Sequence, residues 1–355
     1  MRAFLFYLVS ILVGGLFFAF ARWLGNDYLF FAGYTVLQFI VLATAWNILG
    51  GYCGYVNFGS AAFFAVGAYT SVALHKLAAG VDRFFPESLA SIANLILPLN
   101  IPTLIILGGI VSGLIGLGTG YLTLRLRGAF FAIATLALAV VLQTLIVNWD
   151  FVGGSRGAYI IRPNDVPILG SYIQYLFLIM LVLSVLALAA ARTIEQSRLG
   201  YGFATIRDDE LAAEACGVPT LKLKLIATTI SGALMGMAGA PFPYYIGYLE
   251  PSSAFGLAYA VNSIAMPMIG GTTSWVGPLV GALLLGSAQQ YITVTISSAV
   301  GVLVVGVMLI VFVILAPKGI VGLVQDYMRG GAKADGTPTW RSRLAAFANM
   351  RPGAR

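Results

Sequence analysis

Residues 251–317 read PSSAFGLAYAVNSIAMPMIGGTTSWVGPLVGALLLGSAQQYITVTISSAVGVLVVGVMLIVFVILAP and contain no Asp, Glu, Lys or Arg. A membrane-spanning helix needs about 20 mostly apolar residues, so this run is long enough for three of them. Inside lipid, backbone polar groups must be satisfied within their own segment, and this requirement favours helices. The stretch therefore predicts an all-α protein that crosses a membrane several times.

The rest of the chain has the same character. Hydrophobic residues make up 59% of the 355 residues and charged residues 9%, whereas soluble domains carry about 25% charged residues. An outer-membrane barrel is excluded because its strands alternate polar and apolar residues. Turn signals predict a polytopic bundle of about ten helices over residues 1–317, or eight to ten if the short segments 60–75 and 277–293 are re-entrant. The expected helices are 3–21, 28–49, 60–75, 101–122, 129–148, 172–191, 225–241, 254–270, 277–293 and 297–316.

The positions of lysine and arginine predict the orientation of the bundle. With both termini in the cytosol, the inner segments hold 15 of the 20 basic residues and the outer segments five, as the positive-inside rule requires. Residues 318–355 are rich in Gly, Ala, Arg and Pro, and we expect a disordered cytosolic tail there. Basic residues of this tail face anionic membrane lipid. The net charge of +7 therefore requires no nucleic-acid partner.

Motifs for several kinds of chemistry are missing. The sequence has no GxxxxGKS/T phosphate loop, so it has no recognisable ATP site of its own. Two cysteines and one histidine cannot build a metal cluster. The central parts of the expected spans contain no Asp, Glu, Lys or Arg, whereas proton-driven carriers usually place ionisable residues there. We therefore expect no catalytic residue, no metal site and no cofactor bound by this chain.

Two glycine-rich breaks interrupt the apolar runs. The first break, residues 50–59, reads GGYCGYVNFG, and the second break, residues 270–278, reads GGTTSWVGP. Irregular backbone at membrane depth is tolerated where it lines a cavity or is buried in protein. One interpretation is therefore a translocation path, and the other is a pair of cytosolic turns with close-packing glycines. The candidate path residues are Gly50, Gly51, Gly54, Asn57, Asn262, Gly270 and Gly271.

Charge is concentrated in one internal segment. Residues 192–224, RTIEQSRLGYGFATIRDDELAAEACGVPTLKLK, hold 10 of the 33 Asp, Glu, Lys and Arg residues. An interfacial helix resting on lipid would favour Lys and Arg on its polar face. The acidic residues of this segment favour contact with another protein instead, so we interpret it as a cytosolic coupling loop.

A short helix is predicted within this loop. Thr205 followed by Asp208 fits a capping box, and Gly217 fits a helix stop, so the helix is expected over 206–216. Leu211, Ala212 and Ala215 would form a small apolar patch suited to a groove on a partner. The candidate coupling residues are Thr205, Arg207, Asp208, Asp209, Glu210, Leu211, Ala212, Ala213, Glu214, Ala215 and Gly217.

The same segment resembles a known family. Residues 211–217, LAAEACG, resemble the EAA-x3-G loop of ABC importer permeases, although Leu211 stands where the motif has Glu and Glu210 lies next to it. Residues 204–210, ATIRDDE, are similar to the AIRDNE-type stretch of the branched-chain amino-acid permeases of the LivM/LivH type. The segments 51–69, 124–137 and 317–322 agree, and LRLRG at 124–128 favours the LivM branch.

The resemblance implies a division of labour. Two homologous permease chains form the path, two cytosolic ATPases bind ATP and magnesium and drive transport, and a periplasmic binding protein delivers substrate. This chain would be one permease subunit in the bacterial inner membrane. Its substrate would be a branched-chain amino acid or a related small polar solute, because importers of urea, amides and aromatic acids share these motifs.

Two other function classes remain open from the residues alone. A stand-alone secondary carrier or channel predicts ion-driven transport by this chain without partners. A membrane-embedded enzyme or scaffold predicts catalytic residues within the membrane, and the sequence supplies no candidates for them.

Overall fold

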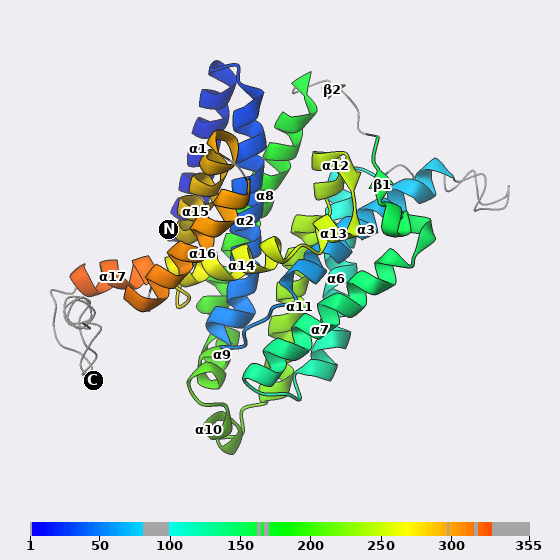
Figure 1. Ribbon diagram of the computed structural model, residues 1–355. Helices are drawn as coiled ribbons and strands as arrows, with labels where there is room; N and C mark the ends of the chain where they lie inside the picture. The colour runs from blue at the N-terminus through cyan, green and yellow to red at the C-terminus, as the bar shows by residue number, and fades with distance from the viewer. Residues whose placement is uncertain are drawn as a thin grey trace, which may run out of the picture.

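The computed structural model describes residues 2–80, 99–161, 165–166, 170–296, 298–315 and 319–328. Most of these residues lie in helices that run side by side (Figure 1). The elements of the first half are α1 Arg2–Trp23, α2 Asp27–Asn47, the π-helix Ile48–Tyr52, α3 Ser60–Ala79, α6 Ile101–Thr123, α7 Ala129–Val147, two short 3-10 turns at Asp150–Val152 and Gly154–Arg156, β1 Ala158–Tyr159, β2 Asp165–Val166 and β3 Gly170–Ser171. The second half has α8 Tyr172–Glu195, α9 Arg198–Asp208, α10 Glu210–Ala215, α11 Thr220–Gly239, α12 Phe242–Ile246, β4 Tyr248–Leu249, α13 Pro251–Ala254, α14 Leu257–Gly270, α15 Val276–Thr295, α16 Ser298–Leu315 and α17 Gly319–Met328.

All ten predicted helix segments form helices, which confirms an all-α membrane protein. Helices α3 and α15 have 20 residues each, or about 30 Å at a rise of about 1.5 Å per residue. The two segments predicted to be short are therefore long enough to cross a bilayer. Seven described segments are both long and apolar enough to do so: 27–52, 60–79, 101–123, 129–147, 172–195, 220–246 and 251–270.

Small residues bring α3, α6 and α11 together. A Cβ added at Gly67 of α3 would lie 2.0 Å from the carbonyl oxygen of Gly236 in α11, and one added at Gly236 would lie 2.6 Å from that of Gly108 in α6. Ser112 of α6 also donates its hydroxyl to the carbonyl oxygen of Gly232 at 2.8 Å. Close backbone approach through glycine and interhelical hydrogen bonds are common means of helix association in membranes.

The outer helix α7 contrasts with this packed centre. Only Phe131 and Thr135 of α7 are buried, and the apolar side chains of Phe130, Ile133 and Val140 are exposed. Beyond α7, the connection to α8 includes β1, which pairs antiparallel with β4. The apolar exposed face of α7 is suited to contact with lipid.

The second break joins α14 to α15, and α14 lies across the direction of α2 and α8 in Figure 1. A Cβ added at Gly270 would lie 1.8 Å from the carbonyl oxygen of Gly277, so the two helices touch through their backbones. Gly270 is therefore a close-packing glycine, and a role for it in translocation stays a prediction. Gly271 has a φ of 121°, which turns the chain between the helices.

Part of the predicted disordered tail is folded. Residues 319–328 form α17, so the prediction of disorder is wrong for them, and residues 329–355 lie outside the described part of the chain. A Cβ added at Gly319 would lie 2.4 Å from the backbone nitrogen of Gly271. The reason is packing: α17 begins against the second break, and Ile320 packs on the core of the bundle.

Candidate functional site

The charged segment folds as two helices rather than one. Helix α9 begins after Ser197, whose hydroxyl oxygen accepts the backbone N–H groups of Leu199 and Gly200. Helix α10 begins after Asp209, whose backbone is extended at φ −159° and ψ 108°. The Asp209 carboxylate accepts backbone N–H groups at the start of α10, at 2.9 and 3.0 Å. Aspartate is among the preferred residues at this position, so the chain breaks at Asp209.

The predicted single helix over 206–216 with Thr205 as its cap is therefore wrong. Thr205 lies inside α9 and donates its hydroxyl to the carbonyl oxygen of Gly202 at 2.8 Å. Arg207 and Asp208 form an ion pair at 3.2 Å near the end of α9. Both side chains are substantially exposed, so the pair contributes little to stability.

The predicted helix stop at Gly217 is confirmed. Gly217 has a φ of 82°, and its N–H donates to the carbonyl oxygen of Glu214 at 2.9 Å. The N–H of Val218 donates to the carbonyl oxygen of Ala213 at 3.0 Å. These two bonds form a Schellman motif, which satisfies carbonyl groups at the helix end.

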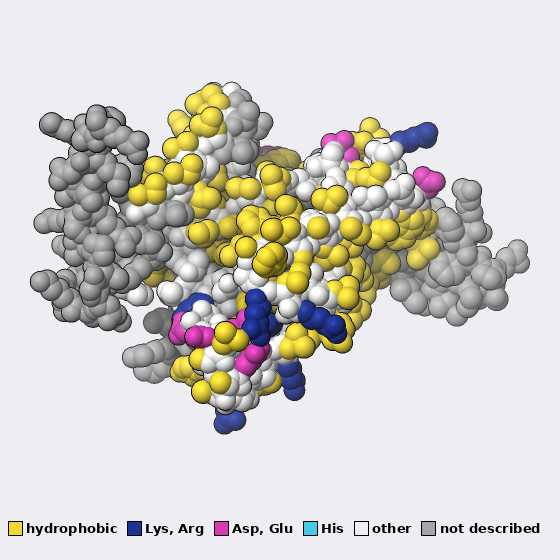
Figure 2. Space-filling view, turned by 60° about the horizontal axis from the view of Figure 1, so that its bottom comes forward, with side chains coloured by type: hydrophobic (Ala, Val, Ile, Leu, Met, Phe, Trp, Pro, Cys, Tyr) yellow, Lys and Arg dark blue, Asp and Glu magenta, His cyan; other side chains and the backbone are white. Residues whose placement is uncertain are grey.

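Helix α10 has an inner and an outer face. Ala213 is buried, whereas Leu211, Ala212 and Ala215 are exposed, as the predicted apolar patch requires. Figure 2 shows Lys, Arg, Asp and Glu side chains gathered at this end of the molecule, beside a larger apolar surface. A small apolar patch with charged surroundings is suited to docking in a groove of another protein.

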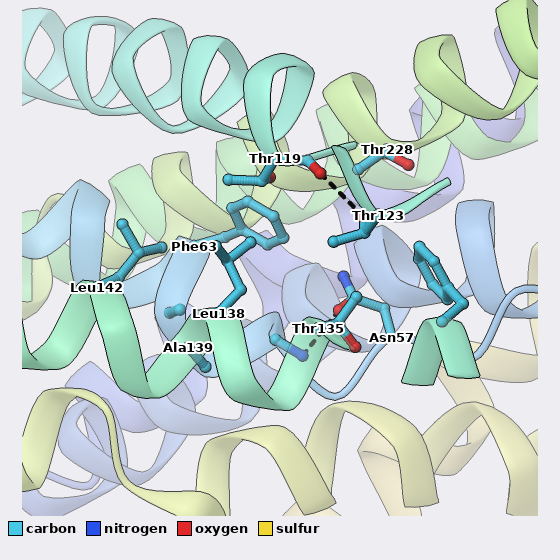
Figure 3. A pocket seen from close by; sticks show the side chains of 12 residues that line it. Asn57, Phe63, Thr119, Thr123, Thr135, Leu138, Ala139, Leu142 and Thr228 are labelled. Atoms are coloured by element: carbon cyan, nitrogen blue, oxygen red, sulfur yellow. Dashed lines mark hydrogen bonds between the residues drawn. The ribbon is translucent and has the colours of Figure 1, made fainter. Parts of the chain in front are cut away.

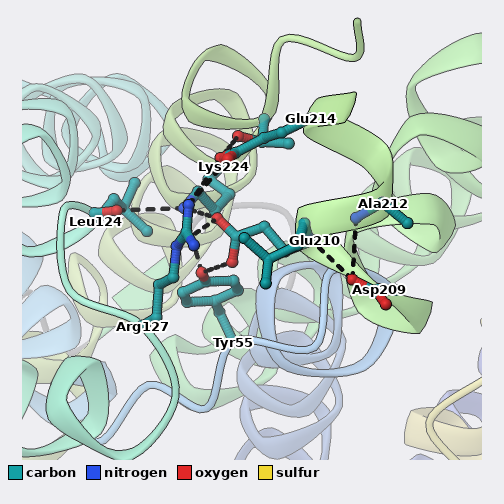
Figure 4. Close-up of polar contacts among 10 residues, drawn as sticks. Tyr55, Leu124, Arg127, Asp209, Glu210, Ala212, Glu214 and Lys224 are labelled. Carbon is teal, nitrogen blue, oxygen red and sulfur yellow. Dashed lines mark hydrogen bonds and ion pairs between the residues drawn. The ribbon is translucent and has the colours of Figure 1, made fainter. Parts of the chain in front are cut away.

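Glu210 lies on the inner side and contacts Lys224 of α11 (Figure 4). The Lys224 ammonium lies 2.7 Å from the Glu210 carboxylate, and 3% of its side chain is exposed. It also donates to the carbonyl oxygen of Leu124 at 3.2 Å. The Tyr55 hydroxyl donates to the other oxygen of Glu210. These four residues and Arg127 form what we call the Glu210 cluster.

Arg127 holds the same helix from the loop between α6 and α7. Its guanidinium lies 3.6 Å from Glu210 and 2.9 Å from Glu214. Burial raises the pKa of the Glu210 carboxyl, but hydrogen bonds from Lys224 and Tyr55 and the charges of Lys224 and Arg127 outweigh it. The net result is a pKa below the usual value, so Glu210 is charged at neutral pH.

The first break packs on the same segment. Gly54 has a φ of 79°, and a Cβ added there would lie 3.2 Å from the Cα of Arg207 in α9. Tyr55, which follows Gly54, belongs to the Glu210 cluster. The candidate path residue Gly54 and the candidate coupling residues are therefore neighbours, although about 150 positions separate them in the sequence.

The two breaks also contact each other. A Cβ added at Gly51 would lie 2.6 Å from the carbonyl oxygen of Thr272. Glu195, the last residue of α8, accepts the Tyr52 hydroxyl at 3.2 Å and the backbone N–H of Trp275 at 2.8 Å. A single carboxylate thus connects both breaks to the start of the charged segment.

Asn57 has a local structural role. Its side-chain oxygen accepts the N–H of Gly59 at 2.7 Å, and its carbonyl oxygen accepts the indole N–H of Trp46 at 2.9 Å. The amide nitrogen of Asn57 has no protein partner and borders a cavity of about 10 Å³ (Figure 3). This space holds about one water molecule, not an amino acid.

The remaining candidate path residues are buried or packed. Asn262 in α14 is 4% exposed, and a Cβ added at Gly50 would lie 2.5 Å from the Trp46 ring. A role for either residue in translocation stays a prediction.

Sequence reasoning missed Lys224, Tyr55 and Glu195. Lys224 is the last residue of the charged segment 192–224, and the charge count alone does not predict its burial. A signal was present, because Lys224 shares one helix face with Ala227, Thr228 and Ser231 at helical spacing. All four side chains are buried, and the three small ones mark the face that packs against other helices.

Fold and site together define a multi-pass membrane protein whose charged segment is fastened to the ends of its membrane helices. Residues 28–313 match the family model of the permease component of the branched-chain amino acid transport system. The chain belongs to this family and is a permease component of an ABC importer.

Similar proteins include permeases for different solutes. The high-affinity branched-chain amino acid permease LivM of Salmonella typhimurium is 26% identical over 326 residues, which cover 84% of this chain and 71% of the relative. The probable branched-chain amino acid permease LivH of Methanocaldococcus jannaschii is 25% identical over a match that covers 75% of this chain and 83% of the relative. The ribose import permease RbsC of Escherichia coli is 29% identical over a match that covers 30% of this chain and 34% of the relative. No solved structure matches the chain.

Proposed function

We propose that this permease imports branched-chain amino acids or related small polar solutes across the bacterial inner membrane, with ATP hydrolysed by partner subunits. The proposed complex contains a second homologous permease, two cytosolic ATPases and a periplasmic binding protein. The substrate class is supported by extent of similarity, since the LivM relative covers 84% of the chain and the ribose permease 30%.

The coupling role of α9 and α10 rests on one observation above the others. The exposed patch of Leu211, Ala212 and Ala215 lies on a helix whose opposite face is fastened to the bundle through Glu210. A helix of this kind is accessible to a partner and connected to the membrane helices at the same time. In the orientation that the positive-inside rule predicts, α10 and the two termini lie in the cytosol.

The test replaces Ala212 with Trp. Because Ala212 is exposed, the variant should fold and insert normally, but an indole does not fit a close-packed groove built for a methyl group. We expect loss of ATPase co-purification and of leucine uptake in cells. Gln196→Trp, also exposed but outside α10, is the control and should keep both. Full uptake and normal ATPase recovery with Ala212→Trp would refute the coupling role.

A further inference from the structure

Lys224 stands apart from the other cations of the charged segment. Its side chain is 3% exposed, whereas Lys222, two residues earlier on the same helix, is exposed. Its ammonium lies 4.7 Å from the centre of the Tyr55 ring and 3.2 Å from the Tyr55 hydroxyl. Lys224 therefore contacts α10, the first break and the loop between α6 and α7 at once.

Stability alone does not account for this arrangement. Desolvation of two charges offsets much of their attraction, and a well-packed apolar pair of similar size is often as stable as a buried ion pair. The cluster also joins elements far apart in the sequence, since Glu210 lies 155 positions after Tyr55 and 14 before Lys224.

The backbone around Asp209 makes α10 dependent on these contacts. One extended residue separates α9 from α10. Helix α9 is anchored separately, through buried Phe203 and Ile206. The position of α10 relative to the bundle is therefore set by its side-chain contacts: Glu210 contacts Lys224 and Tyr55, and Glu214 contacts Arg127 and Thr220.

We propose that the Glu210–Lys224 pair transmits displacement of α10 to α11 and, through Tyr55, to the first break. We assign both as positioning residues, which act through α11 and the first break. This inference rests on the proposed coupling function. A docked partner that moves α10 pulls on Glu210, and the ion pair moves Lys224 and the Tyr55 loop with it. An apolar contact of equal size would hold α10 in place without this directional, charge-assisted link.

The experiment compares complete importers reconstituted in proteoliposomes. The variants are Lys224→Met, Glu210→Met, the double variant with both changes, and Lys222→Met as the matched control. Methionine is unbranched and adaptable, so the double variant removes both charges without leaving one buried and unpaired. The readout is leucine imported per ATP hydrolysed, measured beside ATPase recovery and the thermal stability of the complex.

We expect the double variant to recover the stability that the single variants lose, yet to import about tenfold less leucine per ATP than wild type, a typical size for coupling between sites. Lys222→Met should match wild type. Recovery of wild-type import per ATP in the double variant would show that the pair is only structural and would overturn the proposal.

A further variant keeps the test decisive if the methionine variants do not assemble. Tyr55→Phe removes only the hydroxyl that joins Glu210 to the first break, so import per ATP should fall, and an unchanged value overturns the proposal. The proposed function fails in a different way: the wild-type importer itself would then show no ATP-dependent uptake.

Discussion

Glu195 accepts the backbone N–H of Trp275 at 2.8 Å, across 80 positions of sequence. This bond fastens the last residue of α8 to the second break. Because the charged segment begins at this end of α8, the same carboxylate connects the second break to the proposed coupling segment. At the other end of α9, the Glu210 cluster connects the first break to the proposed coupling segment through Tyr55.

Removing the Glu195 carboxylate should loosen the second break. Glu195→Ala removes the acceptor that the Trp275 N–H and the buried Tyr52 hydroxyl share. We expect a loss of about 1–3 kcal/mol in unfolding free energy, because a buried donor loses its partner. Amide exchange at Trp275 should become faster. Gln196→Ala changes the exposed neighbour and should leave both quantities unchanged. Equal exchange at Trp275 in wild type and Glu195→Ala would contradict the assignment.

The glycines of the second break should not tolerate a methyl group. In Gly270→Ala the new Cβ would lie 1.8 Å from the carbonyl oxygen of Gly277, so two backbones must separate. Overpacking of this kind costs about 1–3 kcal/mol or more, and the melting temperature in detergent should fall. Gly118→Ala is the control, since no atom lies within 4 Å of its new Cβ. A wild-type melting temperature for Gly270→Ala would argue against close packing.

Substitutions at Gly217 test whether the backbone conformation at the end of α10 is needed for docking. No atom lies within 4 Å of a Cβ added there, but its φ of 82° strains most side chains. A left-handed residue other than glycine costs about 1–2 kcal/mol, and asparagine adopts this conformation more readily than valine. We therefore expect Gly217→Asn to keep ATPase co-purification and Gly217→Val to reduce it. Equal recovery in both variants would mean that the turn after α10 is not needed for docking.

The Glu210 cluster should make stability depend on pH. The pKa of Glu210 lies below the usual 4.5 in the folded protein, so its contribution is complete above about 4.5 and is lost as pH falls through the lower, folded value. Wild type should therefore be more stable than Glu210→Gln at pH 7, and the difference should shrink in acid. Melting temperatures measured from pH 7 to pH 3 check this. A difference that stays constant from pH 7 to pH 3 would contradict a lowered pKa of Glu210 in the folded protein.

The two cysteines report the orientation. Cys216 is exposed next to α10, whereas Cys53 is buried, and burial raises the pKa of its thiol to about 12. With α10 in the cytosol, a membrane-impermeant thiol reagent should label Cys216 in inside-out vesicles and not in intact cells. Cys53 should remain unlabelled in both. Arg156→Cys should be labelled in intact cells. Labelling of Cys216 in intact cells would show that the orientation is the reverse of the proposed one.

The sequence determined the class of the molecule because its signals are local. Long uncharged runs leave the backbone no option in lipid except helices, so all ten helix segments could be predicted from composition and turn residues. The stop at Gly217 was equally readable, since a left-handed residue after a helix favours glycine. The motif at 204–217 also indicates the family, because it is a contiguous stretch of sequence.

Only the tertiary structure decided which charged and glycine residues meet. Lys224 contacts Tyr55, 169 positions away, and Glu195 contacts Trp275, 80 positions away. Gly54 packs on Arg207 of another element. No local pattern specifies such pairs. Periodicity and turn chemistry act over a few residues, whereas helix packing fixes which faces come together, and it is these faces that make the coupling site.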